Sequence, residues 1–73
     1  MQSGNEHLQR IGSALRKKRT EKGMSQQELA DISNIAKSTV QRIENGELNP
    51  TILMLITISD ALEVEVIDLI TPL

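Results

Sequence analysis

The chain has 73 residues, enough for one small domain, and contains no Cys, Phe, Tyr or Trp. The missing cysteines exclude disulfides and thiolate metal sites, and a single histidine, His7, gives no basis for a histidine-based zinc site. The net charge of −2 is unevenly spread, because residues 1–43 hold all 8 basic residues and 4 acidic ones, whereas residues 44–73 hold 6 acidic residues and no basic one. A basic half points to an anionic partner, although a mixed solvated surface would carry the same charges.

The sequence predicts neither a membrane protein nor an enzyme. The first ten residues lack the apolar segment of a secretory signal, and the longest apolar run, residues 52–56, is far shorter than the roughly 20 residues that cross a membrane. There is no nucleophile–base pair, metal-ligand cluster or glycine-rich phosphate loop. We therefore expect a cytoplasmic protein with no cofactor and no metal.

The apolar spacing is helical throughout, which predicts an all-α fold of about five short helices in a single domain, residues 1–73. Leu8, Ile11 and Leu15 recur at steps of three and four residues and form one apolar stripe. This stripe predicts a first helix over about residues 5–22, which Gly23 ends.

A capping box predicts where the second helix begins. In the segment SQQE, residues 25–28, the serine hydroxyl can accept from the fourth residue's amide while the glutamate reaches back to the serine amide. The second helix is expected over about residues 25–32, with Leu29 and Ile32 directed inward.

The third predicted helix covers about residues 36–45 and ends before Gly46. Ala36, Val40 and Ile43 are spaced to form its buried face. A turn of only three or four residues separates it from the second helix, which favours a steep angle and a projecting third helix.

The outer face of this third helix is rich in hydrogen-bond donors that suit phosphates or base edges. A projecting helix of this kind fits the major groove of DNA, about 12 Å wide. Any amphipathic helix has a polar outer face, so the pattern alone leaves simple solvation open. The residues concerned are Lys37, Ser38, Gln41, Arg42 and Asn45.

Two more helices are expected near the C-terminus. Pro50 and the N-cap residue Thr51 precede a fourth helix over about residues 51–62. A fifth, short helix is expected over about residues 66–70.

Residues 11–64 resemble the Cro/repressor type of helix-turn-helix, the xenobiotic-response-element family. The resemblance is carried by KGMSQQELA followed by STVQRIENG at this spacing. It implies a lambda-repressor-like five-helix domain with its helix-turn-helix at about residues 25–45. It also implies binding to double-stranded DNA, usually as a homodimer on a two-fold symmetric operator.

The resemblance also implies roles for individual residues. Lys37, Ser38 and Arg42 match positions that face bases, and Gln41 lies beside them. Gln26 matches a residue that holds a backbone phosphate, and Asn45 matches a region that lies along the backbone. Lys17 is a further expected phosphate contact, although the default for a basic helix end is solvation.

Arg19 and Glu44 are expected to form a structural ion pair. Arg19 continues the spacing of Ile11 and Leu15, so it points inward, and Glu44 follows the buried Ile43. In the family these two positions often form a buried pair that ties the first helix to the third.

The C-terminal region carries more apolar residues than one small core needs. Ile52, Leu55, Ile58 and Leu62 satisfy the inward face of the fourth helix. Surplus exposed apolar groups usually mark an interface, so we expect a homodimer through residues 52–73, with a larger monomer core as the alternative. The expected interface residues are Leu53, Met54, Ile56, Val64, Val66, Ile67 and Ile70.

Glu63 stands where the family often has a glycine after the fourth helix. That turn is therefore expected either to be strained or to differ in geometry.

The sequence thus predicts a sequence-specific DNA-binding transcriptional regulator, most simply a repressor. The alternative is a protein-interaction module or antitoxin on the same fold, for which the surplus apolar residues of the fourth helix would contact a protein partner. The two functions overlap, because an antitoxin can also bind DNA.

Overall fold

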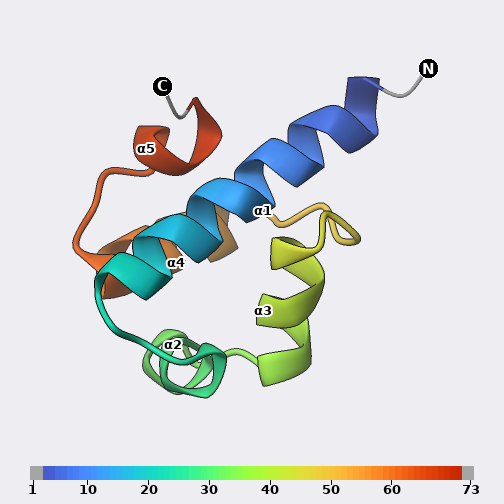
Figure 1. Ribbon diagram of the computed structural model, residues 1–73. Helices are drawn as coiled ribbons and strands as arrows, with labels where there is room; N and C mark the ends of the chain where they lie inside the picture. Colours follow the sequence, from blue (N-terminus) through green and yellow to red (C-terminus); the bar gives the residue numbers. More distant parts are fainter. Residues whose placement is uncertain (1–2, 72–73) are drawn as a thin grey trace.

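The computed structural model describes residues 3–71, and it describes side chains from residue 6 onward. This part of the chain is all-helical, as expected, with five helices and no strand. None of these helices is both long and apolar enough to cross a membrane. Residues 72 and 73 of the expected dimerisation region lie outside the described residues. The helices are α1 (Ser3–Glu21), α2 (Gln26–Ser33), α3 (Lys37–Glu44), α4 (Ile52–Leu62) and α5 (Ile67–Ile70) (Figure 1).

The helix boundaries follow from local capping. The predicted capping box is present, because the Ser25 hydroxyl accepts from the Glu28 amide at 3.0 Å and the Glu28 carboxylate accepts from the Ser25 amide at 2.8 Å. Thr51 caps α4 by accepting from the amide of Met54 at 3.1 Å. Gly46 follows α3 with φ 73°, a left-handed conformation that glycine adopts at little cost.

α1 is the longest helix and runs diagonally across the molecule (Figure 1). It packs against α3 and α5, while α2 packs against α3 and α4. These contacts enclose one aliphatic core, so α3 is held from two sides. The core residues are Ala14, Leu15, Leu29, Ala30, Val40, Ile43, Leu55, Ile58, Leu62 and Leu69.

Gly12 lies where α1 meets the end of α3. A Cβ atom added there would lie 2.3 Å from the carbonyl oxygen of Ile43 and 2.7 Å from that of Glu44. These distances are too short for any side chain, so the two backbones touch directly. Gly12 lies on the same stripe as Leu8 and Leu15, which is the signal that could have identified it.

Three residues expected to face inward do not. Ile32 is 59% exposed, because α2 instead buries Leu29 together with the small residues Ala30 and Ser33. The inner face of α2 is thus rotated by one position from the predicted one.

The other two exceptions lie at helix starts. Ala36 is the N-cap of α3, with extended backbone, and is exposed. Ile52 is the first residue of α4 and is also exposed, because this helix buries Leu55, Ile58, Ser59 and Leu62.

The chain after α4 keeps the left-handed turn although no glycine is present. Glu63 has φ 60° and ψ 39°, and its amide donates to the carbonyl of Asp60. Its carboxylate pairs with the ammonium group of Lys22 at 2.5 Å. Of the two alternatives that the sequence left open, the strained turn is therefore the one observed, with a non-glycine residue in the left-handed conformation.

Candidate nucleic-acid interface

The turn between α2 and α3 sets the direction of the third helix. Asn34 ends α2 in a left-handed conformation, φ 58°, which Asn tolerates better than most residues. The amide of Ile35 then donates to the carbonyl of Ala30 at 3.0 Å, which closes the turn. Three residues separate the end of α2 from the start of α3, which runs at a large angle to α2 and lies at the lower right of the molecule in Figure 1.

α3 buries one narrow face and leaves a broad one open. Val40 and Ile43 are fully buried, and Glu44 is buried beside them. The opposite face brings together side chains spaced one, three and four residues apart, as on one side of a helix. The exposed residues on it are Lys37, Ser38, Gln41, Arg42 and, at the C-cap, Asn45.

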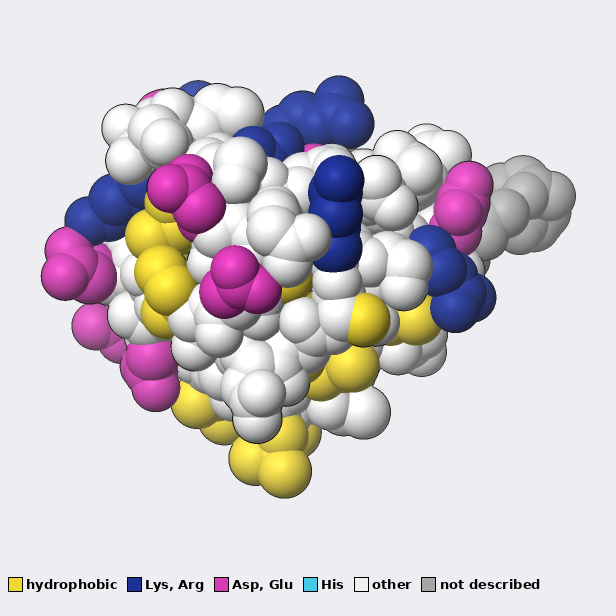
Figure 2. Space-filling model, turned by 90° about the horizontal axis from the view of Figure 1, so that it is seen from below, with side chains coloured by type: hydrophobic (Ala, Val, Ile, Leu, Met, Phe, Trp, Pro, Cys, Tyr) yellow, Lys and Arg dark blue, Asp and Glu magenta, His cyan; other side chains and the backbone are white. Residues whose placement is uncertain are grey.

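Figure 2 shows the surface from the side of α2 and α3, with Lys and Arg side chains over its upper part, its centre and both sides. Uncharged polar groups and several acidic side chains lie between them, and hydrophobic side chains gather mostly along the lower edge and on the left. The protein is acidic as a whole, but this polar area offers both cationic and neutral donors. Such a mixture suits contact with a phosphate backbone and base edges together.

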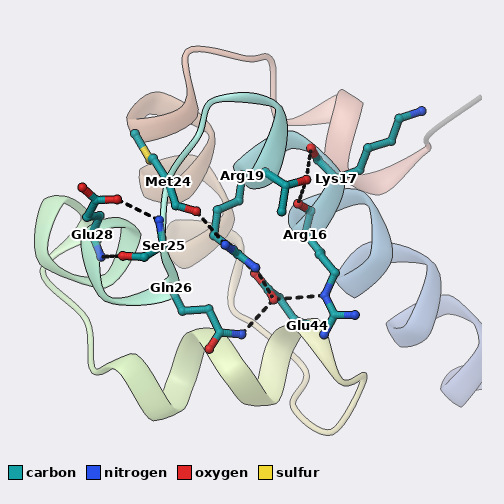
Figure 3. A network of polar contacts seen from close by, with 9 residues as sticks. Arg16, Lys17, Arg19, Met24, Ser25, Gln26, Glu28 and Glu44 are labelled. Atoms are coloured by element: carbon teal, nitrogen blue, oxygen red, sulfur yellow. Dashed lines mark hydrogen bonds and ion pairs between the residues drawn. The ribbon is translucent and has the colours of Figure 1, made fainter.

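A buried carboxylate ties α3 to both preceding helices (Figure 3). The Glu44 side chain is fully buried and accepts from Arg19 Nε at 2.6 Å and from Arg19 Nη2 at 3.2 Å. Arg19 also donates to the carbonyl of Met24 at 2.6 Å. The residues expected to form an ion pair between the first and third helices are therefore paired.

Two further donors reach the same carboxylate. Gln26 Nε2 donates to Glu44 Oε1 at 3.0 Å, and Arg16 Nε lies 3.4 Å from that oxygen. The contact of Arg16 with Glu44 was not predicted from the sequence. Its position three residues before Arg19 puts it on the same side of the first helix, which is the signal that could have revealed the contact.

These donors control the ionisation of Glu44. Burial on its own would raise the pKa of the carboxyl group. Hydrogen bonds from Arg19, Gln26 and Arg16, together with the charge of Arg19, outweigh burial and hold the pKa below its usual value of 4.5. The carboxylate is therefore ionised at neutral pH.

The expected phosphate contacts differ in their surroundings. Gln26 is half-buried in the first turn of α2 and is already oriented by Glu44. Asn45 is exposed at the end of α3. Lys17 is exposed too, but in Figure 3 its side chain points away from the Glu44 cluster. Their contacts with phosphate stay predictions.

The expected interface residues near the C-terminus fall into two groups. Leu53 and Ile67 are 71% and 60% exposed, and Ile56 and Ile70 are exposed as well. In contrast, the half-buried Val64 and Val66 pack against the core, and Met54 is also half-buried. Part of this apolar surplus thus serves the monomer, as the alternative interpretation held, and part lies open to solvent.

The chain was compared with known proteins. Residues 15–69 match the family HTH_3, described as helix-turn-helix. An uncharacterized HTH-type transcriptional regulator, y4dJ from Sinorhizobium fredii, is 34% identical over 62 residues, which cover 85% of this chain and 80% of that protein.

Solved structures agree with this match. The restriction-modification controller protein C.AhdI from Aeromonas hydrophila superimposes with a TM-score of 0.83 at 35% identity, over 85% of this chain and 94% of that one. SinR, a master regulator for biofilm formation solved in complex with DNA, superimposes with a TM-score of 0.76 at 42% identity, over 81% of this chain and 95% of that one. The chain belongs to the HTH_3 helix-turn-helix family of DNA-binding transcriptional regulators.

Proposed function

We propose that the protein is a sequence-specific repressor that binds a two-fold symmetric DNA operator as a homodimer in the cytoplasm. The observation that carries the proposal is the exposed face of α3. Lys37, Ser38, Gln41 and Arg42 all lie on it, and the side of the helix opposite to it is anchored in the core. The anchoring matters because donors must be held in one register to read base edges.

In this proposal Arg42 and Lys37 are the side chains best suited to guanine. Both are exposed and long enough to reach the O6 and N7 acceptors in the major groove. Ser38 and Gln41 provide shorter or neutral donors and acceptors between them. Gln26 and Asn45 flank this set and are proposed to hold the backbone.

The homodimer is supported by the apolar groups that α4 and α5 leave exposed. Leu53 and Ile56 lie on the outer face of α4, and Ile67 and Ile70 belong to α5. A domain of 73 residues buries only roughly 60% of the surface that its unfolded chain exposes, less than a larger domain does, so it gains from covering such groups. Two copies joined there would present two α3 helices to successive turns of the groove, ~34 Å apart.

The experiment that tests sequence reading is selection from a randomised duplex pool, followed by affinity measurements on the selected site. We expect a two-fold symmetric site. Arg42→Ala should weaken discrimination at one base pair per half-site by about 1–3 kcal/mol. Lys22→Ala is the matched control, because it also removes one positive charge but at the Lys22–Glu63 pair after α4. The proposal fails if no site is enriched, or if both variants keep the preference of the wild type.

Repression is the simplest form of the proposal, because it requires only that the domain occupy its operator. A reporter gene placed behind the selected site should fall in expression when the protein is produced. An increase would overturn repression and leave the DNA-binding part of the proposal intact.

A second candidate function is favoured by the same apolar groups of α4. They would also suit a different protein chain, as in an antitoxin that neutralises a partner. Stoichiometric copurification of a second polypeptide that Leu53→Glu abolishes would support this function over a simple homodimer.

A further inference from the structure

The side chain of Arg16 has no role in the proposal so far. Its Nε contacts Glu44 Oε1 at 3.4 Å, whereas Arg19 contacts the same carboxylate at 2.6 Å. Arg16 remains 58% exposed, and Arg19 only 11%. Arg19 therefore contributes more to the stability of the fold at this carboxylate than Arg16 does.

The contact with Glu44 fixes the orientation of the Arg16 guanidinium. Only Nε contacts the carboxylate, and no other partner for the guanidinium is present among residues 6–71, whose side chains the structure describes. A guanidinium is planar, so anchoring it through Nε leaves the edge formed by Nη1 and Nη2 free. That edge matches two oxygens of one phosphate.

The site lies next to the face of α3 proposed to read DNA. Glu44 is three residues after Gln41 and seven after Lys37, so all three lie along the same edge of α3. Arg16 from α1 and Gln26 from α2 approach Glu44 from two sides above this helix (Figure 3). Arg16 and Gln26 thus lie side by side at the border of the exposed face of α3 that is proposed to read DNA.

The local charge is favourable for an anion even though a carboxylate is present. Arg16 and Arg19 contribute two positive charges and Glu44 one negative charge, which leaves one positive charge. Arg19 and Gln26 also hold the carboxylate, so Glu44 stays paired while the Nη1–Nη2 edge of Arg16 contacts an anion.

We infer that Arg16, oriented by Glu44, holds a backbone phosphate of the bound DNA beside Gln26. The inference rests on the proposed function and adds a contact from α1 to it. It places on Arg16 the phosphate contact that the sequence analysis expected from Lys17, whose side chain points away from this cluster (Figure 3).

The test compares Arg16→Ala with Lys17→Ala in the full-length protein. Both variants lose one positive charge from adjacent positions of α1. Binding to the selected duplex and to a random duplex is measured between 50 and 200 mM KCl, together with the melting temperature of each variant. Neutralising one phosphate fewer should reduce the slope of log K against log salt by about 0.9 per protomer.

We expect Arg16→Ala to show this reduced slope, with equal loss of affinity for both duplexes and a nearly unchanged melting temperature. Lys17→Ala should keep most of the wild-type slope, and Arg16→Lys should recover part of what Arg16→Ala loses. An Arg16→Ala slope equal to that of the wild type, or a loss no larger than that of Lys17→Ala, overturns the inference. So does a lower melting temperature with an unchanged slope.

Failure of this inference can be told apart from failure of the proposed function. If the wild type selects a site and Arg42→Ala changes its preference, the proposed function holds whatever Arg16→Ala does. If the wild type selects no site, the proposed function fails first, and the assignment of Arg16 fails with it.

Discussion

The buried faces of α3 and α4 are alike, whereas their exposed faces differ. Each buries a narrow face in the same aliphatic core and exposes a broad one. The exposed face of α3 carries donors such as Gln41 and Arg42, whereas that of α4 carries Ile52, Leu53 and Ile56. The inner faces therefore explain the fold, and the outer faces indicate the partner of each helix: a charged, hydrated one for α3 and an apolar one for α4.

The largest expected effect comes from removing the residue that holds α3 in place. Glu44→Ala leaves the nearly buried guanidinium of Arg19 without its carboxylate, and breaking such a pair costs about 3–5 kcal/mol. Urea denaturation at pH 7 should show this loss in the free energy of unfolding. Glu47→Ala, which removes an exposed carboxylate just after α3, should change it by less than about 0.5 kcal/mol. Equal effects would show that the Glu44 network does not anchor α3.

Making the exposed face of α4 polar should remove its difference from the exposed face of α3 and, with it, the proposed dimer contact. Leu53→Glu places a charge on a side chain that is 71% exposed, so the monomer should keep its fold. In a dimer joined through this face the charge would be buried and unpaired, which should raise the dimer Kd by at least ~100-fold. Sedimentation equilibrium measures this change, with Ser13→Glu on the exposed side of α1 as the control. A dimer as strong as that of the wild type would place the interface elsewhere.

Acid should weaken the region around α3 through Glu44. The folded protein holds the pKa of this carboxyl group below 4.5, its usual value, so it gains stability above that pH. The gain is lost as the pH falls through the lower pKa of the folded state. The free energy of unfolding of the wild type should therefore approach that of Glu44→Gln as the pH falls from neutral to below 4.5. A difference that does not change with pH would show that the charge of Glu44 is not what stabilises the fold.

The smallest expected effect concerns the end of α4. Glu63 adopts φ 60°, and glycine occupies this conformation without the clash that a Cβ atom causes. Glu63→Gly should raise the melting temperature slightly, because the exposed pair with Lys22 that it removes contributes little. Lys22→Ala measures the loss of the pair alone. A melting temperature of Glu63→Gly below that of Lys22→Ala would contradict this account.

Local signals in the sequence located most of the fold. The capping box of Ser25 and Glu28, the N-cap Thr51 and the left-handed Gly46 are where they were predicted, because each depends only on near neighbours. The spacing of buried residues also succeeded in α3, where Val40 and Ile43 are part of the core.

Besides the two helix starts at Ala36 and Ile52, the prediction failed where a short helix packs against two neighbours. In α2 the spacing of Leu29 and Ile32 suggested one face, but the contacts with α3 and α4 bury Ala30 and Ser33 in place of Ile32. Small side chains fit the close approach of helices, and hydrophobic spacing does not report that distance. The Ser33 hydroxyl is buried without a hydrogen-bond partner among the residues that the structure describes.

The sequence could predict those features of the candidate site that depend on one helix alone, but not those that depend on how helices pack together. The outer face of α3 follows from its own spacing, so its residues were identified before its neighbours were known. The convergence of Arg16 and Gln26 on one oxygen of Glu44 depends on how three helices meet. The register that lets them meet is set partly by Gly12, a residue without a side chain.

In the proposed function, the charge division between the two halves of the chain should make homodimer formation and DNA binding respond oppositely to salt. Asp60 lies on the outer face of α4, four residues after Ile56, and all the charged residues of positions 44–73 are acidic. Two copies that meet through this region repel each other, and added salt screens that repulsion, whereas it weakens contact with phosphates. At protein concentrations near the dimer Kd, operator occupancy should therefore vary less with ionic strength than either equilibrium alone.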